Sequence, residues 1–220
     1  MSNIETFCIL LRENPNKCAY MHEVYKKHSY IKFFPALYWK TNFEKAVNLF
    51  IDLDLKLTHN TMSMGAFCIW MSNIKLWIKC LKDYSDKDYF IILEDDVVLP
   101  NNFISLVKKH YIDNGLADKY GGIMLCPKKK FNCIGTLYTK KQLDKILDHI
   151  KTNPISEVLD VYLIQRHRLI YRLYPSIVDY NRYIESVRTA SNDFKRMVKV
   201  RQLIDKVRKH KLKNKDGDNI

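Results

Sequence analysis

The feature that most constrains the fold is a long amphipathic pattern followed by a short apolar run. Apolar residues recur at the i, i+3, i+4 and i+7 positions of a helix over residues 62–81, with Trp70 and Trp77 on one face. Residues 89–93 (Tyr-Phe-Ile-Ile-Leu) are continuously apolar, which is typical of a strand covered on both faces. A helix that leads into a covered strand predicts an α/β sheet flanked by helices.

The rest of the first 180 residues repeats this alternation, without an internal repeat. We predict strands at residues 6–11, 33–37, 122–126, 135–139 and 169–174, and helices at residues 17–28, 42–53, 140–151 and 156–166. The sequence therefore predicts a single α/β domain over residues 1–180, with a mostly parallel central sheet. In such sheets ligands bind beyond the carboxyl ends of the strands.

Composition excludes several other classes of protein. The chain has 220 residues, of which 47% are hydrophobic and 28% charged, which suits one globular domain and excludes a disordered chain. It has no run of about 18 apolar residues, which a membrane helix requires, and its start lacks the basic and apolar regions of a signal peptide. The six cysteines show no zinc-ligand spacing. We therefore expect reduced thiols and a cytoplasmic location.

Positive charge is concentrated at the C-terminal end. Residues 181–220 contain 12 basic and 5 acidic side chains, so they carry +7 of the net charge of +13. Between Phe194 and Val207 apolar residues recur near the helical period, which predicts a basic amphipathic helix that frays beyond Lys209. The pattern favours a helix that packs its apolar stripe on the domain. The alternatives are contact with an anionic membrane surface, an acidic partner or nucleic acid.

Three consecutive carboxylates, Glu94, Asp95 and Asp96, directly follow the apolar run. Such close like charges raise one another's pKa unless a cation compensates. On an extended backbone Glu94 and Asp96 share a face, while Asp95 points the other way. Hard oxygen ligands suit Mg²⁺ or Mn²⁺, which fill their remaining positions with substrate phosphates and water. The cluster therefore predicts a site for a nucleotide or phosphate ester, and a solvated acidic turn is the alternative.

With these residues, the chain resembles glycosyltransferase family 25, the group of lipopolysaccharide β-galactosyltransferases and collagen galactosyltransferases. The specific match runs from Gly65 through Ser72-Asn73 and Trp77 to the apolar strand and the carboxylate triplet, in the family's order and spacing. Softer matches lie at residues 8–17, 33–36, 135–141, 159–163 and 174–175. The resemblance covers residues 5–180 and leaves the basic tail outside.

Three positions depart from the family pattern. Asn73 replaces a His, Lys17 stands where an Arg is common, and Thr139 replaces a Ser. An Asn side chain cannot titrate near neutrality, so an acid–base or charge role of that His would be lost. A catalytically degenerate fold is therefore an alternative to an active enzyme.

The resemblance implies a GT-A-type, Rossmann-like domain that binds a UDP-sugar through Mn²⁺ or Mg²⁺ and transfers a hexose, galactose or glucose, with inversion. It implies that Asp96 is a metal ligand, that Glu94 is a second ligand or a ribose partner, and that Asp95 orients the donor. It also implies that Asp160 is the general base that an inverting transfer needs. The alternative for Asp160 is a solvent-exposed helix residue.

Further contacts follow from the same resemblance. It assigns nucleotide-sugar binding to Arg12, Lys17, Gly65, Ser72, Asn73 and Glu94. The acceptor is a glycan, a lipid-linked oligosaccharide or a protein hydroxyl, and no nucleic acid is expected as a partner. A competing hypothesis is a nucleic-acid-binding or membrane-surface-binding protein whose basic tail carries the function. His167, near the end of the domain, is a further candidate metal ligand, but a surface histidine is the favoured interpretation.

Overall fold

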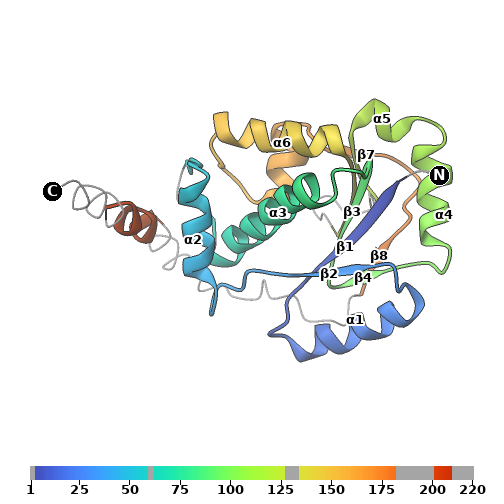
Figure 1. Cartoon of the computed structure of the whole chain (residues 1–220), viewed down its shortest axis with the longest axis horizontal. Helices are drawn as coiled ribbons and strands as arrows, with labels where there is room; N and C mark the ends of the chain where they lie inside the picture. Colours follow the sequence, from blue (N-terminus) through green and yellow to red (C-terminus); the bar gives the residue numbers. More distant parts are fainter. Residues whose placement is uncertain (1–2, 59–61, 127–133, 182–200, 210–220) are drawn as a thin grey trace.

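The computed structural model describes residues 3–58, 62–126, 134–181 and 201–209. Its centre is a six-stranded sheet with the order β2-β1-β3-β6-β5-β7 (Figure 1). The strands are β1 (Ile4–Leu10), β2 (Lys32–Pro35), β3 (Tyr89–Glu94), β5 (Gly122–Met124), β6 (Gly135–Thr139) and β7 (Tyr171–Arg172). Within the described part, β6 runs antiparallel to its neighbours and the other five strands are mutually parallel.

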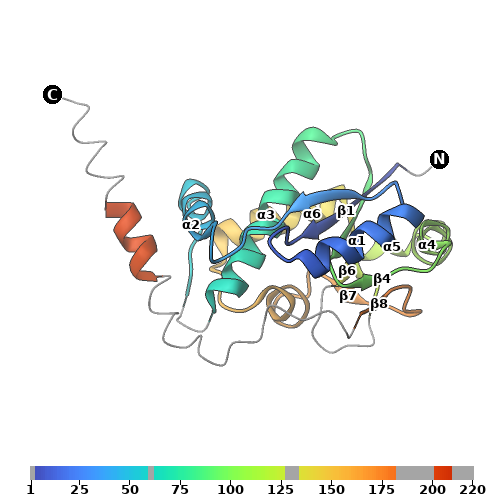
Figure 2. The same ribbon diagram turned by 90° about the horizontal axis from the view of Figure 1, so that it is seen from below.

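Helices cover both faces of this sheet (Figures 1 and 2). One face carries α1 (Pro15–Lys27), α4 (Phe103–Val107), the π-helical segment η1 (Lys108–Ile112) and α5 (Leu116–Tyr120). The other face carries α2 (Phe43–Asp52), α3 (Met64–Asp83), α6 (Lys140–Thr152) and the π-helical segment η2 (Val161–Arg166). The predicted α/β fold with a mostly parallel sheet is thus confirmed.

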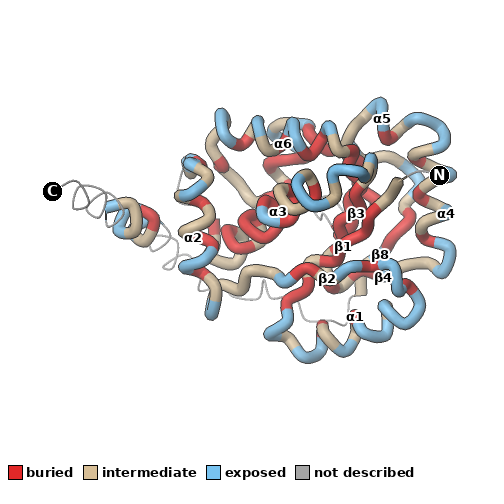
Figure 3. Tube along the Cα trace, viewed as in Figure 1, coloured by how far each residue is buried: buried red, intermediate tan, exposed pale blue. Residues whose placement is uncertain are grey.

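The hydrophobic core consists of two clusters of buried residues, one on each face of β3. Phe90 and Ile92 pack with α3 and α6, whereas Ile91 and Leu93 pack with α1 and α4, as the two-residue period of a strand requires. Figure 3 shows the buried residues concentrated in the sheet and on the inner sides of the helices. Each such side chain contributes about 1.5–3 kcal/mol through burial. The core therefore fixes the register of β3, and with it the position of the residues that follow.

The predicted long helix is α3. Its N-cap is Ser63, whose Oγ accepts a hydrogen bond from Ala66 N at 3.1 Å. Trp70 and Trp77 are fully buried on its sheet-facing side, with their rings edge to face at 6.4 Å. Helix α1 begins in the same way, with Asn14 as N-cap and Pro15 at the first position. Capping chemistry therefore places the N-termini of both helices.

Some elements differ from the predictions. The late helix of residues 156–166 begins only at residue 159, and the predicted strand of residues 169–174 is reduced to the two residues of β7. A separate two-stranded antiparallel sheet of β4 (Val97–Val98) and β8 (Asp179–Tyr180) has no counterpart among the predicted strands. Two-residue strands are too short to show a hydrophobic period, which is why the sequence pattern misses them.

The described part of the C-terminal tail is a helix of residues 201–209, which lies beside α2 (Figures 1 and 2). Ile204 is buried in the core cluster of α2, and Arg208 Nη2 donates a hydrogen bond to Leu55 O at 3.1 Å. This helix packs its apolar stripe on the domain, as the pattern predicts. The residues around Phe194, the end of the tail, Cys133 and the Lys128–Lys130 run lie outside the described residues. Within the described ranges, no helix is long and apolar enough to span a bilayer.

Candidate active site

The carboxyl ends of three parallel strands meet at one edge of the sheet, which we call the carboxyl edge. Register pairs Leu10 of β1 with Pro35 of β2, and Ile9 of β1 with Glu94 of β3. The loop after β1, with the exposed Arg12, and the turn after β3 therefore lie side by side. The fold thus brings the N-terminal loop and the carboxylate triplet together.

The three carboxylates of the triplet have different environments. Glu94 and Asp96 are partly exposed, whereas Asp95 is only 6% exposed. Asp95 Oδ2 accepts a hydrogen bond from Leu11 N at 2.9 Å, and Oδ1 accepts one from the ammonium group of Lys17. Lys17 is also buried, so the two charges form a buried ion pair. Asp95 and Lys17 are therefore occupied with each other. Strand β3 ends at Glu94, so Asp95 and Asp96 lie in the turn after it and the predicted alternation of an extended backbone does not continue through the triplet.

The three carboxylates of the triplet also act on the pKa of a nearby buried thiol, that of Cys8. Cys8 lies on β1 directly opposite Leu93 and is completely buried. Burial raises its pKa well above the usual value, and Asp95, Asp96 and Glu94 raise it further, while Lys17 lowers it. All three carboxylates thus act on one point beneath the site, so a cation at this edge would be favoured.

The backbone at Asp96 is held by two other segments. Asn181 N, directly after β8, donates to Asp96 O at 2.7 Å, and the hydroxyl of Tyr20 on α1 donates to Val97 O at 2.7 Å. Burial raises the pKa of Tyr20, a hydrogen bond with the Asn181 side chain lowers it, and nearby Asp96 raises it. The Tyr20 hydroxyl therefore lies close to both Asp96 and Asn181.

The donor set suits a hard divalent cation that also binds substrate. Among the described residues, no three His, Cys, Asp or Glu side chains converge to hold a metal ion by themselves. Glu94 and Asp96 supply two partly exposed carboxylates, and Asp96 Oδ1 is shielded from solvent. Mg²⁺ and Mn²⁺ are commonly bound through one or two carboxylates together with phosphates and water. The residues present thus fit such an ion.

Besides Lys17, two residues of the predicted nucleotide-binding group are engaged within the protein. Ser72 Oγ accepts from Leu37 N at 2.8 Å and donates to Cys68 O at 2.7 Å, so it ties the loop after β2 to α3. The Asn73 amide donates to Ile69 O of its own helix at 3.0 Å. A Cβ at Gly65 would meet its nearest neighbours at 3.8 Å, an ordinary contact, so nothing around Gly65 demands a glycine. Each lies on α3, whose N-terminus points to the carboxyl edge.

Asp160 is buried, so the alternative of a solvent-exposed helix residue is wrong. It is 3% exposed, and its Oδ1 has no hydrogen-bond partner among the described residues. The segment before it is fixed on α3, because Trp70 Nε1 donates to Glu157 O at 2.8 Å. A buried carboxylate oxygen without a partner is costly and indicates a group whose partner arrives with a ligand.

Next to Asp160, the structure shows an aromatic cluster that the sequence pattern did not predict. The His167 ring lies 4.1 Å from the Tyr162 ring and 4.4 Å from the His149 ring, measured between centroids. Burial lowers the pKa of both histidines, and the charge of Arg166 lowers that of His167 further. No sequence signal links His149 and His167, because they meet only through the fold. His167 is thus half-buried against aromatic rings.

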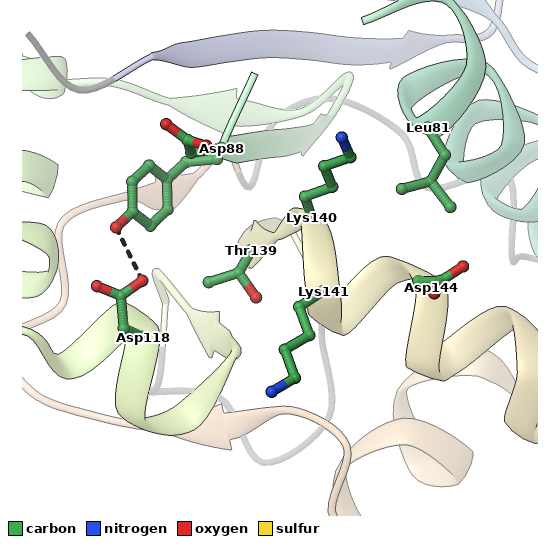
Figure 4. A pocket seen from close by; sticks show the side chains of 8 residues that line it. Leu81, Asp88, Asp118, Thr139, Lys140, Lys141 and Asp144 are labelled. Carbon is green, nitrogen blue, oxygen red and sulfur yellow. Dashed lines mark hydrogen bonds between the residues drawn. The ribbon is translucent and has the colours of Figure 1, made fainter. Parts of the chain in front are cut away.

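A hollow of about 720 Å³ lies at the opposite edge of the sheet, which we call the amino edge (Figure 4). Its lining residues are Leu81, Asp88, Tyr89, Asp118, Thr139, Lys140, Lys141 and Asp144. Tyr89 begins β3 and its hydroxyl donates to Asp118 Oδ1 at 2.8 Å. Since β3 spans the sheet between this hollow and the triplet, the hollow is separate from the carboxyl edge. Ligands of parallel sheets bind at the carboxyl ends of strands, so we place the site at the triplet.

Comparisons with known proteins identify the family. The family described as "Glycosyltransferase family 25 (LPS biosynthesis protein)" matches residues 3–184, which is most of the chain. The chain therefore belongs to glycosyltransferase family 25, and its fold and family support glycosyl transfer.

Other comparisons add little. None of the curated proteins compared with the chain matches it. Among the matching solved structures is the "crystal structure of a glycosyltransferase involved in the glycosylation of the major capsid of PBCV-1". It is 11% identical, with a TM-score of 0.36, over 68% of this chain and 65% of that one. The chain thus spans less than two thirds of that protein, and this likeness carries no argument.

Proposed function

We propose that the protein is a metal-dependent glycosyltransferase that moves a hexose, galactose or glucose, from a UDP-sugar to an acceptor hydroxyl with inversion. The observation that carries the proposal is the division of the triplet. Asp95 is neutralised by Lys17, whereas Glu94 and Asp96 present two carboxylates at the carboxyl edge. That arrangement fits Mn²⁺ or Mg²⁺ with a nucleoside diphosphate.

The roles of the side chains follow from their positions. Asp96 and Glu94 would hold the metal ion, which when bound stabilises the negative charge that develops on the departing diphosphate. The exposed Arg12 lies in the loop beside them and would contact the diphosphate.

An inverting transfer also needs a general base for the acceptor hydroxyl. In the proposed reaction, the acceptor oxygen bonds to the anomeric carbon, the bond from that carbon to the diphosphate oxygen breaks, and the proton of the hydroxyl passes to the base. Asp160 fits this role because it is a buried carboxylate with one oxygen lacking a partner in the described structure. An incoming hydroxyl would supply that partner.

The acceptor and the cellular setting belong to the same proposal. A glycan, a lipid-linked oligosaccharide or a protein hydroxyl each offers the required oxygen. The helix of residues 201–209 uses its apolar stripe on α2, so its exposed Arg201, Lys206 and Lys209 are available for an anionic membrane surface. We therefore propose a cytoplasmic enzyme with peripheral membrane contact, and we expect no nucleic-acid partner.

The test is thermal melting of the protein with UDP-, GDP- and CMP-sugars, each with and without Mn²⁺. A ligand that binds only the folded state raises the melting temperature by mass action. We expect a shift with one UDP-sugar that requires Mn²⁺ and disappears in Asp96→Ala. Asp144→Ala, which changes an exposed carboxylate of the amino-edge hollow, is the matched control and should keep the shift.

Two other outcomes would reject the proposal in different ways. A metal-dependent shift without turnover on any acceptor would indicate a degenerate fold that binds donor only, as the Asn73 substitution suggests. No shift with any nucleotide sugar, together with salt-sensitive binding to nucleic acid, would assign the function to the basic tail.

A further inference from the structure

Helix α1 holds the residues on either side of Asp96. Lys17 and Tyr20 are three positions apart, so they project from the same face of α1. The Lys17 ammonium group pairs with the Asp95 carboxylate, and the Tyr20 hydroxyl donates to Val97 O at 2.7 Å. Asp96 is the one residue between these two points, so its backbone is fixed from both sides.

A third contact reaches Asp96 from the end of the domain. Asn181 N donates to Asp96 O at 2.7 Å, and the Asn181 side chain hydrogen-bonds with the Tyr20 hydroxyl. Strands β4 and β8, which continue these segments, have only two residues each. Such a short ladder provides few hydrogen bonds, so the side chains of α1 supply much of the constraint on this turn.

We infer that Lys17 and Tyr20 are positioning residues, which we call the α1 clamp, and that they orient the Asp96 carboxylate for the metal ion and the diphosphate. The metal part of this inference rests on the proposed function, whereas the contacts of Lys17 and Tyr20 with the turn after β3 do not. Residues that hold a metal ligand in place often change metal affinity by about 10- to 100-fold when mutated. Lys17 thus acts through Asp95 and not on the nucleotide.

The sharpest variant is Tyr20→Phe, because it removes one hydroxyl and keeps the ring. Tyr25→Phe is the matched control, since Tyr25 lies on the same helix, is 39% exposed and packs its ring against Phe33. Lys17→Met leaves Asp95 buried without its partner and is expected to fold poorly. Lys17→Arg keeps the charge but changes the size and shape of a buried cation, so it is not a matched control.

The first measurement is calorimetric titration of UDP in the presence of Mn²⁺. We expect Tyr20→Phe to weaken binding about tenfold, while Tyr25→Phe stays within about twofold of the wild type. If wild type binds and Tyr20→Phe binds equally well, the α1 clamp is overturned and the proposed function stands.

The second measurement is amide hydrogen exchange of the metal-free, nucleotide-free proteins. We expect residues 96–98 and 179–181 to exchange faster in Tyr20→Phe than in Tyr25→Phe or the wild type. If neither the wild type nor any variant binds UDP with Mn²⁺, the proposed function fails. The hydrogen-exchange result alone then tests the α1 clamp. Unchanged exchange in Tyr20→Phe overturns it in either case.

Discussion

The two edges of the central sheet differ in what they offer a ligand. The amino edge has a hollow of about 720 Å³, lined by both lysines and aspartates (Figure 4). The carboxyl edge has the two partly exposed carboxylates of Glu94 and Asp96 and the buried ion pair of Asp95 with Lys17. The hollow offers space, whereas the carboxyl edge offers positioned charge.

The size of a hollow is therefore not what identifies the site of the proposed reaction in this fold. At the amino edge the charges are largely satisfied: the Lys140 ammonium donates to Ser85 O at 2.7 Å, and Asp118 accepts from Tyr89. At the carboxyl edge three carboxylates lie within one turn, and Asp95 is paired with Lys17. Clustered carboxylates at the carboxyl end of a strand are typical of functional sites.

The largest expected effect comes from removing the carboxylate of Asp96. Asp96→Ala should lower kcat/KM of glycosyl transfer by more than about a thousandfold, because a metal ion contributes several kcal/mol and each 1.36 kcal/mol is tenfold. Steady-state kinetics with the donor identified by melting would measure it. Asp144→Ala at the amino edge should leave kcat/KM within about twofold. Equal losses of kcat/KM in both variants would contradict the placement of the reaction at the carboxyl edge.

Asp160→Asn should have the next largest effect. Loss of a general base lowers the rate by roughly 10²–10⁴-fold, so kcat should fall by at least about a hundredfold. The Mn²⁺-dependent melting shift with the donor should persist, because Asp160 is not assigned to donor binding. A lost shift with little change in kcat would instead assign Asp160 to the nucleotide.

The sequence predicts the part of the site that depends on local pattern. Strand β3, which positions the triplet, follows from the continuous apolar run of residues 89–93, whereas Asp95 and Asp96 lie in the turn after the strand, where a strand period has no bearing. Helix α3 follows from its apolar spacing in the same way. Both features are decided by neighbours in the chain, so a pattern within about ten residues reveals them.

The sequence does not predict the partners that residues find across the fold. Lys17 resembles a nucleotide-binding residue by position, yet its ammonium group is engaged by Asp95, which lies 78 positions away. Ser72 is similarly engaged by the loop after β2, and His149 meets His167 only when α6 and η2 pack. No single-chain pattern encodes such pairs, since they arise from strand order and helix packing.

The third prediction concerns stability at the two edges. Lys17→Met should lower the free energy of unfolding by about 3–5 kcal/mol, because it leaves the Asp95 carboxylate buried without its cation. Lys140→Met at the amino edge should cost at most about 1 kcal/mol, since Lys140 is much more exposed. Urea denaturation measures both. In Lys17→Met/Asp95→Asn, removal of the second charge should restore part of the loss, and no restoration would contradict a buried ion pair.

The smallest expected effect is a pH dependence of stability to which the paired histidines His149 and His167 contribute. His149 and His167 have pKa values lowered by burial, and no histidine lines the amino-edge hollow. As pH falls below about 6.5, the unfolded state binds protons at these histidines more readily than the folded state, so folding stability decreases with acidity. The groups that act on the pair are Lys145, Arg166 and Glu157, of which only Glu157 favours protonation.

This dependence should appear as a lower melting temperature at pH 5.5 than at pH 7.5, and it should be reduced in His167→Gln because one titrating ring is lost. His22→Gln, which changes an exposed histidine on α1, should keep the wild-type pH dependence. A profile that stays the same in His167→Gln would show that the acid sensitivity arises elsewhere. Since Asp160 and His167 cap the two ends of η2, a reduced dependence would also tie the acid response to the segment that presents the proposed base.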